Sequence, residues 1–204
     1  MCIRDRTQSA LLEAMSDRQV SADGETHTLP SPFMVVATQN PFEFEGTYPL
    51  PESQLDRFLI RISLGYPNRE DERRVLENHR QSSPVDELQP ALSAEQVTEL
   101  QQAVRDVRID GSIHDYLLDI VAATRESEEL HVGVSTRAAI SLSRAAQSYA
   151  LIRGRDFVVP DDVKDLAVPG LSHRVISKGF LHGGQRGAIE GIVKRIVESV
   201  AVPA

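Results

Sequence analysis

The chain has 204 residues, with 22 Lys or Arg against 30 Asp or Glu, so its formal net charge is −8 at pH 7. A composition that is 41% hydrophobic and 25% charged excludes wholesale disorder. The single cysteine excludes a disulfide framework and a multi-cysteine zinc site, and no apolar run is long enough for a membrane helix. The acidic balance argues against a nucleic-acid partner. With no export signal ahead of the first predicted helix, we expect a cytoplasmic location.

The first elements are predicted from residue 7 onward. Residues 1–6 resemble a translated linker left by sequence assembly, a non-native scar that we exclude from the fold prediction. Residues 8–18 carry apolar side chains on one face and predict an amphipathic helix. Residues 19–29 alternate around Asp23-Gly24, a pair typical of hairpin turns because both positions tolerate φ > 0.

Two apolar runs predict strands of a parallel sheet. Residues 33–38 are continuously apolar, which is typical of a strand covered on both faces. Asn40 follows the C-terminal end of this run, and ligands bind at that edge in open α/β sheets. Residues 41–54 contain three prolines and predict an ordered loop, and 58–62 predict a second strand. So small a sheet cannot cover itself, and we therefore expect an N-terminal truncation.

The second half of the sequence predicts helices. Asn68 is expected to cap a helix that runs to about residue 80. The polar stretch 81–92 is the predicted linker between an α/β part at 7–80 and a helical part at 93–204. Caps and apolar spacing in the helical part predict helices over 93–107, 112–126, 135–152, a short one from 160, and 187–200. The glycine-rich segment 179–191 has no predicted role.

The sequence lacks the motifs that bind the phosphates of a nucleotide. A Walker A motif, G-x-x-x-x-G-K-[ST], needs a lysine after glycine, whereas the three lysines follow Val163, Ser177 and Val193. A Walker B motif needs an apolar strand that ends in Asp-Glu. The pairs at 71–72 and 86–87 follow polar or proline-containing sequence instead.

Six motifs occur in the order that characterises one known family. They are TQSALLEAM at 7–15, ATQNP at 37–41, EGTYPLPE at 45–52, QLDRF at 54–58, GVSTR at 133–137 and RGRDFVVPDDV at 153–163. Together they resemble the part of MoxR-family AAA+ ATPases that follows Walker B. The resemblance implies a partial P-loop AAA+ parallel sheet, with the sensor 1 region and a β-hairpin insertion, followed by an all-α lid domain.

The resemblance also implies a function. MoxR-like proteins are expected to form a homo-oligomeric ring, often a hexamer, that binds ATP and Mg²⁺ between subunits and remodels or assembles client proteins. The sequence does not identify the client. Because the motifs that hold ATP and Mg²⁺ are missing, we expect the 204-residue chain alone to hydrolyse no ATP. The alternative is a non-catalytic interaction module that binds a partner or a ring of full-length subunits.

Three site residues follow from the resemblance. Asn40 resembles sensor 1, which would orient the attacking water; otherwise it caps the loop before Pro41. Arg57 resembles the arginine finger supplied to a neighbouring subunit; otherwise it is a surface residue paired with Asp56 or Glu52.

Arg137 resembles sensor 2, which would bind the γ-phosphate in its own subunit. Otherwise it is a solvated arginine in the first turn of a helix.

The hairpin at 19–29 resembles the insertion that points toward the pore of a ring, with Val20, His27 and Leu29 able to touch a substrate. It could equally pack on its own subunit. Among the histidines, His173 is expected to be structural.

Overall fold

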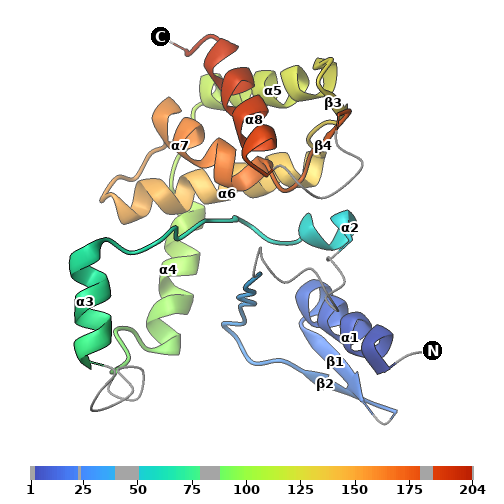
Figure 1. Ribbon diagram of the computed structural model, residues 1–204, viewed down its shortest axis with the longest axis vertical. Helices are drawn as coiled ribbons and strands as arrows, with labels where there is room; N and C mark the ends of the chain where they lie inside the picture. The colour runs from blue at the N-terminus through green and yellow to red at the C-terminus, as the bar shows by residue number, and fades with distance from the viewer. Residues whose placement is uncertain (1–2, 23, 40–50, 79–87, 180–185, 204) are drawn as a thin grey trace.

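A group of four helices holds the main hydrophobic core. The computed structural model describes residues 3–22, 24–39, 51–78, 88–179 and 186–203. Helices α5 (Gly111–Glu126), α6 (Thr136–Ile152), α7 (Pro160–Leu171) and α8 (Arg186–Ser199) contact one another in the upper part of Figure 1. Their apolar faces meet at fully buried side chains, among them Ile120, Val163, Leu171 and Val193. The predicted helices of this region are therefore confirmed, with ends that differ by one or two residues.

The helix starts form through the predicted capping groups. Before α4 (Ala94–Asp106), Ser93 Oγ accepts from the Gln96 amide, and the Gln96 side chain accepts from the Ser93 amide. Ser135 Oγ accepts from the Ala138 amide at the start of α6. Asn68 Oδ1 accepts from the amides of Glu70 and Asp71 before α3 (Arg69–Asn78). Each cap satisfies amides that have no partner within the helix.

The helical part is not entirely α-helical, which corrects the expected all-α lid. Strands β3 (Leu130–Val132) and β4 (Ile176–Ser177) form a two-stranded antiparallel sheet. Strands of three and two residues are too short to leave an alternating pattern. Their pairing depends on segments that lie far apart in the sequence.

The N-terminal helix carries the predicted hairpin. Helix α1 (Ile3–Asp17) begins five residues before the predicted start, and β1 (Gln19–Ala22) pairs antiparallel with β2 (Glu25–Thr28). Glu13 on α1 accepts hydrogen bonds from the Ser21 hydroxyl at 2.6 Å and the Ser21 amide at 3.1 Å. These hydrogen bonds lower the pKa of Glu13. The hairpin therefore packs on a helix of its own chain, as Figure 1 shows.

The two predicted sheet strands are not formed, which corrects the expectation for 33–38 and 58–62. Both named sheets of the described residues are antiparallel pairs, and neither includes these segments. Met34 and Val36 are 80% and 77% exposed, so no described segment covers them. A strand exists only where a neighbour accepts and donates its backbone hydrogen bonds, and apolar composition cannot supply that neighbour. Instead, the short helix α2 (Glu52–Leu55) overlaps the end of the predicted loop at 41–54.

The segment after α2 is attached to the helical group. In Figure 1 the chain from α2 to α3 runs along the lower edge of that group. The Arg61 amide donates to the Pro169 carbonyl of α7 at 2.9 Å, and the Phe58 carbonyl accepts from side chains that follow α7. Polar contacts between distant parts of the chain thus fix residues 56–61, the segment that contains Arg57.

Candidate functional site

The loop that leads into α6 is held by side chains of α5. Thr124 Oγ1 accepts from the Val134 amide at 3.0 Å and donates to the Val121 carbonyl at 2.7 Å. Arg125 Nε donates to the Val134 carbonyl at 2.9 Å. A Cβ atom on Gly133 would lie 2.7 Å from the Arg125 Cα atom, so this close approach requires glycine. These contacts fix the position from which α6 starts.

Arg137 lies in the first turn of α6 and is exposed. The free amides and the positive end of the helix dipole favour an anion at this place. A cationic side chain beside them strengthens that preference, although it is unfavourable for the helix itself. The arrangement suits a negatively charged group such as phosphate.

A buried arginine lies directly behind this helix start. Arg174 Nη1 donates to the Ala138 carbonyl at 3.4 Å, and Nη2 donates to the Phe58 carbonyl at 2.7 Å. Its Nε lies 3.5 Å from Asp56 Oδ1, with side-chain exposures of 2% for Arg174 and 24% for Asp56. Burial lowers the pKa of Arg174, the Asp56 carboxylate opposes that effect, and the charge of Arg137 adds to it. Arg137 and Arg174 are therefore close enough to repel each other.

His173 shares the acceptor of Arg174. Its Nε2 lies 2.9 Å from the Phe58 carbonyl, while its buried Nδ1 has no hydrogen-bond partner among the described residues. Burial lowers the pKa of His173, and the charges of Arg174 and Arg61 add to this effect, although the Phe58 carbonyl opposes it. The neutral imidazole with the proton on Nε2 fits these contacts, because a carbonyl needs a donor.

Arg57 is exposed, and its guanidinium donates a hydrogen bond to the Ser16 hydroxyl of α1. The ion pair considered for Arg57 with Asp56 is not among the contacts of the structure, because Asp56 pairs with Arg174 instead. Asn40 lies outside the described residues. The structure thus brings the backbone around Arg57 to the start of α6, where Arg137 lies.

Comparisons with known proteins show to which family the chain belongs. The family model for the ATPase family associated with various cellular activities (AAA) matches residues 3–60, and the model for the AAA lid domain matches 122–192. Chaperone MoxR1 of Mycobacterium tuberculosis is 39% identical over 207 residues. The chain is a MoxR-family AAA+ sequence. The lid match lies within the helical part of the chain, and the AAA match covers α1, the hairpin and α2.

The similarity to known proteins covers nearly the whole of this chain. The uncharacterised protein YeaC of Bacillus subtilis is 46% identical over 200 residues, which are 97% of this MoxR-family chain and 62% of YeaC. The match to MoxR1 covers 97% of the chain and 54% of that relative. A crystal structure from Cytophaga hutchinsonii, described as a candidate ATPase, is 37% identical with a TM-score of 0.83 and covers 98% of this chain and 63% of that one. The MoxR-family chain thus spans about three-fifths of these proteins or less.

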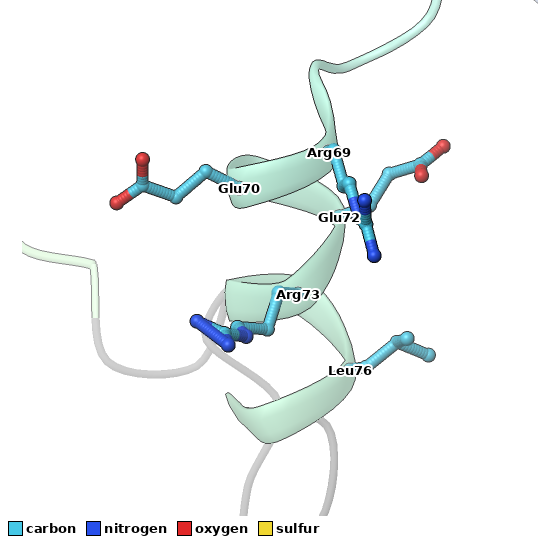
Figure 2. A pocket seen from close by; sticks show the side chains of 5 residues that line it. All are labelled: Arg69, Glu70, Glu72, Arg73 and Leu76. Carbon is cyan, nitrogen blue, oxygen red and sulfur yellow. The ribbon is translucent and has the colours of Figure 1, made fainter.

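A surface hollow on α3 has no features of a site. It is lined by Arg69, Glu70, Glu72, Arg73 and Leu76, all from one exposed helix. Figure 2 shows Glu70 and Arg73 on one side of the helix and Glu72 and Leu76 on the other. The charged groups do not converge on a common point, and Arg74 forms ion pairs with Glu70 and Asp71 along the same helix. A solvated helix face explains this hollow.

No metal or membrane feature appears in the described part of the MoxR-family chain. No group of three His, Cys, Asp or Glu side chains there could hold a metal ion. No helix in the same residues is long and apolar enough to cross a membrane. Arg137 fits a phosphate group by charge, but the described residues offer no acidic set for Mg²⁺.

Sequence reasoning missed the cluster that connects the two halves of the MoxR-family chain. His173 was expected to be structural, and Asp56 was considered only as a partner of Arg57. No role was predicted for Arg174. The sole signal in the sequence was the presence of Arg and His at the end of a helix. Their common acceptor lies more than 110 positions away, so local spacing could not reveal it.

Proposed function

We propose that the chain forms the sensor and lid part of an ATP-hydrolysing ring subunit that remodels or assembles client proteins. In this proposal Arg137 binds the γ-phosphate in its own subunit, Arg57 reaches the nucleotide of the neighbouring subunit, and Asn40 orients the attacking water. The observation that carries the proposal is an exposed arginine in the first turn of a lid helix, where backbone amides already favour anions.

The proposal also divides the chain into three parts. Residues 7–80 supply the later part of the AAA+ core, 81–92 connect it to the lid, and 93–204 form the lid. ATP and its Mg²⁺ supply the phosphoanhydride bond and charge neutralisation when they are bound. The residues of this chain would sense the phosphate and stabilise its developing charge, while the phosphate cradle and metal ligands come from outside the described residues. We propose a hexameric ring in the cytoplasm.

The experiment compares ATP hydrolysis by the full-length protein and two arginine variants. Arg57→Ala is expected to lower kcat by about 10³-fold, because it removes an arginine that stabilises the transferring phosphoryl group. Arg137→Ala is expected to lower kcat as well and also to weaken binding of a fluorescent ATP analogue to its own subunit. Arg144→Ala is the matched control, because Arg144 is exposed on the same helix two turns further on, and its guanidinium donates a hydrogen bond to Gln147 Oε1.

Two results would contradict the proposal. Equal activity of Arg137→Ala and Arg144→Ala would remove the sensor role. Absence of ATPase activity in the full-length wild-type protein, together with inhibition of a homologous ring by the added 204-residue chain, would favour the interaction module.

A further inference from the structure

One buried guanidinium connects the two candidate nucleotide-contacting arginines. Arg174 donates to the carbonyl of Ala138, the residue directly after Arg137, and to the carbonyl of Phe58, the residue directly after Arg57. Its third contact is with the carboxylate of Asp56, the residue directly before Arg57. A single side chain therefore touches both neighbours of Arg57 and one neighbour of Arg137.

Further hydrogen bonds hold the same backbone segment, whereas Arg174 Nε and Asp56 Oδ1 form an ion pair without a hydrogen bond. His173 approaches the same Phe58 carbonyl at 2.9 Å, and the Arg61 amide donates to the Pro169 carbonyl. The planar guanidinium fixes the directions of its donors, whereas an ammonium would leave them free to rotate. The side chain of Arg174 is 2% exposed, so water does not compete for these donors. Residues 56–61 must then move together with the end of α7 and the start of α6.

A charged side chain is not required at position 174 merely to hold the two segments together. Burying a guanidinium is costly, and apolar side chains commonly hold two segments together at least as well. The repulsion between Arg137 and Arg174 adds to the cost. An anion bound by Arg137 would relieve that repulsion and so favour the connected arrangement. The fixed donor geometry, and not adhesion alone, is what this arginine contributes.

We propose that Arg174, supported by His173 and Asp56, is a positioning residue that couples the lid to Arg57. A change of the lid around the nucleotide of one subunit would move the finger that the same subunit presents to its neighbour. This inference rests on the proposed function. It adds a residue that touches no nucleotide and transmits the state of one site to the next.

The coupling has a distinctive consequence in a ring. A defect in Arg174 should impair the site of the neighbouring subunit, because that site receives the misplaced Arg57. A defect in Arg137 should impair the site of its own subunit. A merely structural role of Arg174 would instead damage its own lid and its own site.

The test mixes two inactive forms of the full-length protein. Arg174→Lys keeps the charge but loses the two fixed Nη donors. The resulting displacement of Arg57 is expected to lower kcat by about 10²-fold. An equal mixture of Arg174→Lys and Arg137→Ala should regain about a quarter of the wild-type rate. Random assembly of such a mixture around a ring pairs an intact site with an intact finger at about that fraction of interfaces. Arg57→Ala mixed with Arg137→Ala should recover to the same extent.

Controls separate the possible failures. Asp56→Asn removes the carboxylate charge that pairs with Arg174, on the segment that carries Arg57, and it should behave like Arg174→Lys. This second variant keeps the test valid if Arg174→Lys does not fold. Arg155→Lys is the matched control. It alters another arginine whose two Nη atoms donate to one partner, the Asp162 carboxylate, and it should retain wild-type activity.

The outcomes differ for the two ideas. ATPase activity could recover when Arg137→Ala is mixed with Arg57→Ala, but not when it is mixed with Arg174→Lys or Asp56→Asn. That result overturns the coupling and leaves the proposed function standing. Recovery with none of the three overturns the proposed division of roles and the coupling with it.

Discussion

Replacing Thr124 by valine tests whether α5 holds the loop before α6. The Thr124 hydroxyl accepts the amide of Val134, and both residues are buried, with exposures of 0% and 1%. Valine has nearly the same shape but offers no acceptor, so the Val134 amide would be left without a partner. A buried donor without a partner costs about 1–3 kcal/mol, and each kcal/mol lowers Tm by about 2–4 °C in a chain of this size.

Two measurements would check this prediction. Urea unfolding followed by circular dichroism gives the change in the free energy of unfolding, and native-state hydrogen exchange gives the protection of the Val134 amide. Thr98→Val is the matched control, because the Thr98 hydroxyl donates to the Ala94 carbonyl on an exposed face of α4. That variant should stay within about 0.5 kcal/mol of the wild type. Equal stabilities of the two variants, or unchanged exchange at Val134, would refute the reasoning.

Two further predictions concern the same region. Gly133→Ala should destabilise the chain by about 1–3 kcal/mol in urea unfolding, because its Cβ would meet the Arg125 backbone at 2.7 Å. His173→Gln should remove a pH dependence of stability. Burial keeps the folded-state pKa of His173 below its ordinary value of 6.5, so the unfolded chain binds the proton first as the pH falls. The wild-type free energy of unfolding should therefore decline below about pH 6.5 relative to the variant.

Each of these has its own control. Gly111→Ala introduces a Cβ with nothing within 4 Å, so it should leave stability unchanged or raise it by about 0.4–1 kcal/mol. A Gly133→Ala variant as stable as Gly111→Ala would show that the loop shifts without cost. For His173, a difference between wild type and variant that stays constant from pH 8 to pH 5 would show that its imidazole titrates normally.

Local signals in the sequence were sufficient for most helices and for one hairpin. Ser93, Asn68 and Ser135 cap the helices that they were expected to cap, since a cap depends only on residues within one turn. The Asp23-Gly24 pair predicted the hairpin for the same reason, and Gly24 has φ of 85°. The six ordered motifs were enough to predict the family. The sequence also provided the candidate site residues Asn40, Arg57 and Arg137, whose roles remain predictions.

Only the tertiary structure decided which distant groups meet. Apolar composition at 33–38 and 58–62 suggested strands, but a strand needs a hydrogen-bonded neighbour, and none of the described segments provides one. Asp56 could have paired with the adjacent Arg57, yet it lies beside Arg174, 118 positions later in the sequence. Burial favours the pair with Arg174, because a carboxylate stabilises a desolvated guanidinium more than it stabilises an exposed one. Local spacing reports the forces within one helical turn, whereas desolvation arises only when the chain has folded.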